Sequence, residues 1–237
     1  MYRMTKLLGL LVAIMGVNAF GVGFIGTPTA ELEQGQWNIG FNYLYSDMEL
    51  AKTTIDSLWV DTLGGSGSHS FKMEIDDVKT QRYYGTIGYG ITSMWEAYVQ
   101  LGIADLKAQV KEEGDTDWTG LNFDNDFAWG WGTRYTFYEQ DKVRWGASLQ
   151  MNWLDTTWDS QGPDFNEQVD YSTFDLIVAV GPTVDMGGWN LYGGPFYYML
   201  DGDFDIELME TIPGGTEFVT ESGDLEEDSN IGGFVGV

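Results

Sequence analysis

The stretch DFAWGWGTRYTFYEQDKVRWGASLQMNW, residues 126–153, decides the fold class. Large apolar side chains occupy every second position in it, as Phe127, Trp129 and Trp131 illustrate. Successive side chains of a β-strand point to opposite faces, so this period of two predicts two amphipathic strands. Only residues 139–142 separate the two runs, which predicts a tight turn between antiparallel neighbours.

The same alternation recurs along the chain in stretches near the length of about 9–11 residues that a tilted membrane-spanning strand needs. No stretch is continuously apolar for the roughly 20 residues of a membrane-spanning helix. The pattern predicts an all-β fold, an antiparallel up-and-down transmembrane β-barrel with eight visible strands. These strands are expected at residues 36–47, 79–91, 94–108, 126–138, 143–153, 169–184, 189 to about 206, and 230–237.

Short and long connections between these stretches alternate strictly. The short ones are residues 92–93, 139–142 and 185–188, and the long ones are 48–78, 109–125, 155–168 and about 207–229. Short turns and long loops therefore lie at opposite ends of the predicted sheet. In outer-membrane barrels the short turns face the periplasm and the long loops face outward.

The composition limits the class of protein. The chain has 237 residues, which suits a single domain, and no cysteine, which excludes disulfides, thiolate nucleophiles and cysteine-based metal sites. Its formal net charge is -26, with only 11 Lys and Arg, so nucleic acid is not an expected partner. The acidity favours cationic partners, or it serves to keep exposed loops solvated.

The first residues are typical of an export signal. Arg3 and Lys6 precede the apolar run 7–17, and Val17 and Ala19 are the small residues that a signal peptidase requires. We expect a signal peptide at residues 1–19, a periplasmic N-terminal segment at 20–35 and the transmembrane barrel at 36–237. The N-terminal segment is too irregular for a membrane strand, and the sequence leaves open whether it is a plug or a tether.

Aromatic side chains gather at both ends of the predicted strands. Such rings favour the two headgroup boundaries of a membrane, whereas a soluble barrel is apolar inside and polar outside. The alternation therefore predicts an aromatic girdle formed by Trp37, Tyr89, Trp95, Trp129, Trp145, Trp153 and Trp189.

The leader, the amphipathic strands, the alternating turns and the girdles together resemble bacterial outer-membrane barrels of the OmpA, OmpX and OmpW type, or porin-like barrels, over residues 20–237. The resemblance implies eight strands, location in the outer membrane of a Gram-negative cell, and contact with lipid, lipopolysaccharide and the barrel-assembly machinery. Such barrels usually end on a terminal aromatic residue, whereas this chain ends at Val237. A C-terminally truncated fragment of a barrel with ten or more strands therefore stays an alternative.

Five charged residues fall on the polar faces of neighbouring strands and are expected to meet inside the barrel. They could form a charged constriction that selects solutes, or a salt-bridge network that fills a narrow lumen. These lumen charges are Arg82, Glu96, Arg134, Arg144 and Asp175.

Acidic clusters fall in the predicted loops, at residues 112–117, 201–205 and 224–228. Asp201, Asp203 and Asp205 alternate as the first ligands of a calcium loop do, which makes them weak candidates for bound Ca²⁺. They lack the distant Glu and the flanking helices of such a loop, so a solvated loop is the competing interpretation. We expect no other cofactor.

The only histidine, His69, lies in the glycine- and serine-rich stretch 64–70 of the first long loop. Ser68 and Ser70 are its neighbours in sequence, which does not make a catalytic pair. The sequence therefore predicts a barrel that is not an enzyme. Two functions remain: a narrow porin-like pore for ions or small solutes, and a structural or adhesive barrel whose acidic outer loops bind cations or surface partners. The solute, the loop partners and the oligomeric state are left open.

Overall fold

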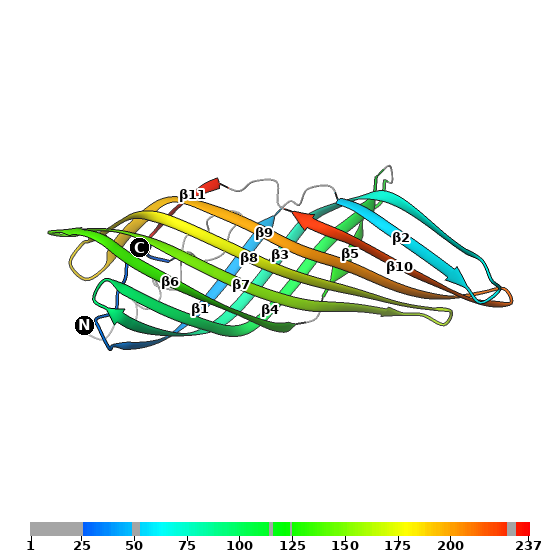
Figure 1. Cartoon of the computed structure of the whole chain (residues 1–237), viewed down its shortest axis with the longest axis horizontal. Helices are drawn as coiled ribbons and strands as arrows, with labels where there is room; N and C mark the ends of the chain where they lie inside the picture. Colours follow the sequence, from blue (N-terminus) through cyan, green and yellow to red (C-terminus); the bar gives the residue numbers. More distant parts are fainter. Residues whose placement is uncertain (1–25, 49–52, 114–115, 124, 227–230) are drawn as a thin grey trace, which may run out of the picture.

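The computed structural model describes residues 26–48, 53–113, 116–123, 125–226 and 231–237, and in these residues the chain is all β (Figure 1). The predicted signal peptide, residues 1–19, lies outside the described residues. The strands are β1 (Trp37–Met48), β2 (Thr53–Asp61), β3 (Ser66–Thr92), β4 (Trp95–Glu112), β5 (Thr119–Asn122), β6 (Asp126–Gln140), β7 (Val143–Gln161), β8 (Phe165–Asp185), β9 (Asn190–Ile212), β10 (Gly215–Glu226) and β11 (Ile231–Gly236).

Antiparallel pairing closes eight of the strands into a ring, in the order β3, β2, β10, β9, β8, β7, β6, β4 and back to β3. The remaining three strands pair with members of the ring: β1 with β3, β5 with β4, and β11 with β9. β1 and β11 lie in one half of the elongated molecule, together with the turns that join β3 to β4, β6 to β7 and β8 to β9 (Figure 1). β2, β5 and β10 lie in the other half (Figure 1). We call these the short-turn half and the far half.

Each of the eight predicted stretches lies on a strand, namely β1, β3, β4, β6, β7, β8, β9 and β11. The three short connections are confirmed as tight turns, and Asp141 in the second of them has a φ of 54°. The prediction of long loops is wrong at residues 48–78, 155–168 and about 207–229, where β2, β10 and the outer parts of β3, β7, β8 and β9 build the far half. The predicted loop 109–125 contains only the end of β4 and the short strand β5.

The interior of the far half is an apolar core. Its inward side chains alternate with outward ones that are mostly polar, apart from exposed apolar residues on β2, β9 and β10, so the region largely has the arrangement of a water-exposed sheet. The loop prediction failed because the apolar and polar positions of these strand segments are exchanged relative to those of the predicted membrane strands. On β8 and β9 the same cluster extends into the short-turn half, where Ile177 and Ala179 are registered with Gln150 and Ser148. The buried residues of the whole cluster are Ile55, Met73, Ile75, Val78, Leu106, Ala108, Leu121, Phe123, Val169, Tyr171, Ile177, Ala179, Phe196, Tyr198, Leu200, Phe204 and Leu225.

The short-turn half has the reverse arrangement. Its buried interior residues include Gln100, Ser148 and Gln150, while its outward positions carry apolar side chains such as Ile39 and Phe41, which are 83% and 70% exposed. β4 and β7 therefore change which of their faces is apolar about halfway along their length, whereas the inward residues Phe196, Tyr198 and Phe204 of β9 are apolar in both halves.

An irregularity in β3 keeps its apolar side chains inside the far half. The pairing with β4 shifts between Asp76 and Lys79, and Asp77 adopts a φ of 55°. An extra residue of this kind is a β-bulge, and it changes which of two alternating sets of side chains points inward. Met73 and Ile75 on one side of the bulge and Arg82 on the other are consequently all buried.

We expect Phe204→Ala to lower the free energy of unfolding by about 3–5 kcal/mol, because it leaves a cavity in the far-half core where Phe204 is 3% exposed. Urea titration of the protein in detergent micelles, followed by tryptophan fluorescence, measures this loss. Phe218→Ala, at a side chain that is 48% exposed, is the matched control and should change stability by no more than about 0.5 kcal/mol. Equal losses in both variants would contradict the assigned core.

A carboxylate inside the far half gives a pH-dependent prediction. Burial, and then the nearby charge of Glu221, raise the pKa of Glu167 above its ordinary value. Ionised Glu167 therefore destabilises the folded chain at neutral pH, and this cost disappears as the pH falls through the raised pKa and below the unfolded one. Glu167→Gln should be more stable than the wild type at pH 7, and the difference in urea midpoint should shrink towards pH 4. A difference independent of pH would contradict this assignment.

Candidate functional site: the interior of the ring

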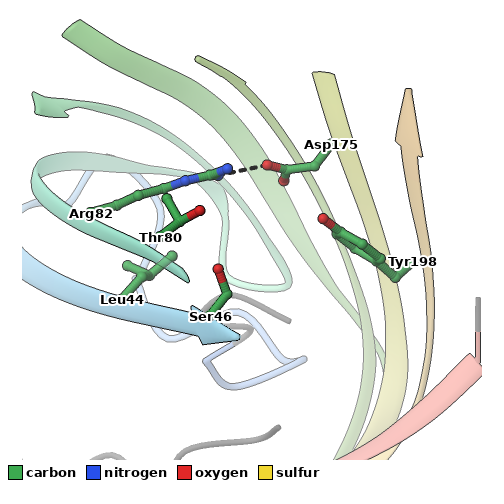
Figure 2. Close-up of a pocket in the computed structure, with 6 residues that line it drawn as sticks. All are labelled: Leu44, Ser46, Thr80, Arg82, Asp175 and Tyr198. Carbon is green, nitrogen blue, oxygen red and sulfur yellow. Dashed lines mark hydrogen bonds and ion pairs between the residues drawn. The ribbon is translucent and has the colours of Figure 1, made fainter. Parts of the chain in front are cut away.

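An ion pair crosses the interior of the ring between strands that are distant in sequence. Arg82 of β3 donates from Nη1 to Oδ2 of Asp175 on β8 at 2.6 Å, and both side chains are at least nine-tenths buried. Figure 2 shows the two side chains reaching toward each other from separate strands. A buried charge is stable only when it is paired, so the two residues must be present together.

The pair belongs to a longer hydrogen-bonded layer. Asn152 of β7 donates to Oδ1 of Asp175, and Gln100 of β4 donates to Oδ1 of Asn152. Close beside them, the hydroxyl of Tyr98 donates to Gln150 at 2.9 Å. The layer thus ties the walls of the ring together through side chains from β3, β4, β7 and β8.

A cavity of about 10 Å³ adjoins the ion pair. This space is at the lower limit of what admits a single water molecule. Leu44, Ser46, Thr80 and Tyr198 complete its lining (Figure 2). On the far side of this layer the interior is filled by the apolar core, so the ring has no wide water-filled passage at this level.

A second ion pair lies nearer the tight turns. Arg134 of β6 donates to Oε1 of Glu96 on β4 at 2.7 Å, and its guanidinium lies 4.8 Å from the centre of the Tyr98 ring. The other carboxylate oxygen of Glu96 accepts the backbone N–H groups of Glu31 and Leu32, at 2.8 and 3.1 Å. Glu96 therefore holds the N-terminal segment as well as its own strand neighbour.

The N-terminal segment 26–32 lies inside the short-turn half, where we call it the plug segment. The backbone N–H of Ala30 donates to Thr136 at 3.0 Å, and its carbonyl accepts from Arg144 at 2.7 Å. Thr29 is fully buried and donates to the hydroxyl of Thr183 at 2.8 Å. Wall side chains thus satisfy backbone groups that strand pairing would otherwise satisfy. Of the two alternatives left by the sequence, the structure supports the plug.

A glycine in the wall makes room for this segment. A Cβ on Gly146 of β7 would lie 2.5 Å from the carbonyl oxygen of Pro28. Real side chains do not tolerate such an approach, so only glycine allows the plug segment to lie against β7.

Between the plug segment and the hydrogen-bonded layer lies a cavity of about 330 Å³. Its lining combines amide side chains with aromatic rings and a single ion pair, so it is polar without a strong net charge. The lining includes Glu31, Asn38, Asn42, Thr86, Glu96, Tyr98, Gln100, Arg134, Gln150, Asn190 and Tyr192.

The five predicted lumen charges all lie inside the ring, but they do not form one cluster. Arg82 pairs with Asp175, Arg134 pairs with Glu96, and Arg144 binds the backbone of the plug segment. The amide and hydroxyl residues that complete these contacts were not predicted as site residues, because an alternating Thr or Gln is equally consistent with any polar face. These residues are Gln100, Thr136, Asn152 and Thr183.

Five of the seven predicted girdle residues are exposed on the outside of the short-turn half: Trp37, Tyr89, Trp95, Trp129 and Trp145. Trp189 is exposed in the turn between β8 and β9, but it lines the cavity of about 330 Å³. Trp153, the seventh, is partly covered because it stacks on Trp129, with ring centres 4.3 Å apart, and contacts Phe174. Trp37 and Tyr89 also contact each other, at 4.7 Å.

Two other sequence predictions need correction. Asp201, Asp203 and Asp205 lie on strand β9 and not in a loop, and all three are exposed on its outer face. His69 lies on β3 and stacks on Phe71, with ring centres 5.7 Å apart. In both places the strand continues where the sequence composition suggested a flexible loop. Within the described residues no three His, Cys, Asp or Glu side chains converge as metal ligands.

Comparison with known proteins adds no family. No protein-family model matches the sequence, and no curated protein matches it either. The described part of the chain contains no helix that is long and apolar enough to cross a membrane.

We expect Arg82→Met to destabilise the protein by about 3–5 kcal/mol, because it leaves Asp175 buried and unpaired. The double variant Arg82→Met with Asp175→Leu should recover part of that loss, because it removes the unpaired charge but also the acceptor of the buried Asn152 amide. Urea titrations of the wild type and both variants in detergent micelles measure these changes in stability. Lys111→Met, at a partly exposed pair with Glu74, is the control and should cost about 1 kcal/mol or less. A double variant as unstable as the single one would contradict the attribution of the loss to the unpaired charge of Asp175.

Proposed function

We propose that this protein is an exported outer-membrane β-barrel with a closed interior, and that it acts as a structural or interaction protein presenting its far half outside the cell. In this proposal the short-turn half spans the lipid and the plug segment faces the periplasm. The observation that carries the proposal is the change of the outer face from apolar in the short-turn half to polar and acidic in the far half, with the reverse change inside β4 and β7.

A lipid environment accounts for the outside of the short-turn half. Its outward apolar side chains run from Trp95 to Ile103 on β4 and from Trp145 to Trp153 on β7. About 9–11 residues of a tilted strand cross a bilayer. The outward positions then become charged, beginning with Asp105 and Asp155. An exposed apolar band bounded by aromatic rings is what lipid and its two headgroup layers favour.

The filled interior favours the structural hypothesis over the pore. A solute would have to displace the plug segment, pass the Arg82–Asp175 layer and then open the far-half core. An eight-stranded barrel has an interior that side chains just fill. The pore hypothesis retains one supporting feature, the polar cavity of about 330 Å³ beside the plug segment.

The other expectations stay predictions. We propose no catalytic step. Bound Ca²⁺, contact with lipopolysaccharide and recognition by the assembly machinery are likewise untested.

Insertion in lipid is tested by refolding the protein into bilayers whose acyl chains carry bromine, which quenches tryptophan fluorescence on contact. We expect strong quenching that is reduced in Trp131→Phe, because Trp131 lies in the outer apolar band, and unchanged in Trp118→Phe, in the far half. Quenching lost equally in both variants would contradict the proposed position of the bilayer.

Closure is tested by conductance in planar bilayers. We expect no discrete current steps from the wild type, and none from Glu96→Ala with Arg144→Ala, because the far-half core still closes the path after the plug segment is released. Ion-selective steps from the wild type would overturn the closed barrel in favour of the pore. Steps from the double variant alone would show that the plug segment, and not the core, closes the interior.

A further inference from the structure

The charges of the far half are distributed unevenly over its strands. β2, β8, β9 and β10 are consecutive neighbours in the ring, and their sequences contain no Lys and no Arg. Lysines of the far half lie instead on β3 and β4, as Lys72, Lys107 and Lys111. One wall of the far half is therefore purely acidic.

On this wall, acidic side chains lie directly opposite one another. Asp203 of β9 is registered with Asp224 of β10, and Asp205 of β9 with Asp170 of β8. Like charges directly opposite on one face of a sheet destabilise it. Asp201 and Glu207 of β9 extend the same exposed row. Asp170 already accepts hydrogen bonds from Thr157 and Gln168, so the repulsion that a bound cationic group would relieve is concentrated at Asp203 and Asp224.

Next to these carboxylates, at the tip of the far half, apolar side chains lie exposed on the same outer face. Val60, Phe218 and Met209 are registered neighbours across β2, β10 and β9. Leu58 lies two residues before Val60 on β2 and faces the same side. Their exposed fractions range from 43 to 54%. These four residues are far from the apolar band of the short-turn half, so lipid in the proposed bilayer does not cover them.

We propose that this outer face of β2, β8, β9 and β10 is a docking surface for a cationic polypeptide that also carries apolar side chains. The apolar row Leu58, Val60, Met209 and Phe218 would anchor the partner, and Asp170, Asp203, Asp205 and Asp224 would bind its Lys or Arg side chains. An apolar centre beside charges of one sign selects a partner with the complementary charge. The inference rests on the proposed function, because it requires the far half to stand in water.

A cationic polypeptide fits this face better than the alternatives. An anionic lipid or polysaccharide would be repelled by the carboxylates, and a bare divalent cation would not use the apolar row. Within the described residues the carboxylates also do not converge in the groups of three that a metal site requires.

The test uses the full-length protein in zwitterionic lipid nanodiscs, with empty nanodiscs as the blank. Two labelled peptides serve as probes: one alternates lysine with leucine, and the other alternates lysine with serine. Fluorescence anisotropy should show that the lysine–leucine peptide binds more tightly than the lysine–serine peptide, and that binding weakens as salt rises from 0.05 to about 0.5 M, where charges are screened within a few ångströms.

Asp203→Asn with Asp205→Asn and Asp224→Asn should weaken binding of the lysine–leucine peptide roughly tenfold or more. Phe218→Ser with Met209→Ser should weaken it by a similar factor, and should remove the preference over the lysine–serine peptide. The matched control removes three charges at the opposite end of the molecule, Glu139→Gln with Asp141→Asn and Asp185→Asn, and should leave binding unchanged.

Equal weakening by the control would show attraction to net charge alone and would overturn the docking surface. Unchanged binding in the serine variant would overturn the apolar anchor, and with it the proposal. A titration with calcium chloride alone tests the other ligand. If Ca²⁺ binding depends on Asp203, Asp205 and Asp224 and peptide binding does not, the ligand of this surface is a cation and the proposal of a polypeptide partner is overturned. Bromine quenching measured on the same variants reports membrane insertion separately, so failure of the docking surface is distinguishable from failure of the barrel proposal.

Discussion

The alternation of side chains between two faces of a strand is the constraint on which the rest of this structure depends. A strand that passes from one medium to another must exchange its apolar and polar faces at the boundary, because the pleat offers no third side. β4 does this without irregularity: Glu96 and Gln100 are its buried residues at one end, and Leu106 and Ala108 at the other. β3 needs a bulge at Asp77 to achieve the same result.

The interior reflects that exchange. Where the outside is apolar, the inside must satisfy polar groups without bulk water, and it does so with two buried ion pairs and a chain of amides. The plug segment enters this polar region because it offers backbone N–H and C=O groups that Glu96, Thr136 and Arg144 can bind. Where the outside is polar, an apolar core takes over and needs no such network. The interior is thus closed by two different kinds of packing in series.

Closure of the interior moves the search for activity to the outside of the far half. There the strands extend beyond the proposed bilayer and carry acidic residues over an apolar tip. A rigid sheet fixes the spacing of these side chains far better than a flexible loop would. A partner that binds here would meet a preformed surface and would not have to order it first.

The sequence by itself determined the strands of the short-turn half, their tight turns, the outward aromatic residues and the inward direction of Arg82, Glu96, Arg134, Arg144 and Asp175. All of these follow from a period of two, which is a local property that neighbouring residues reveal. Only the tertiary structure decided that Arg82 meets Asp175 across 93 residues of chain, that Glu96 binds residues 31 and 32, and that the expected loops continue as strands. Those outcomes depend on which strands face each other around the ring, and this is not encoded in the spacing of residues along a single strand.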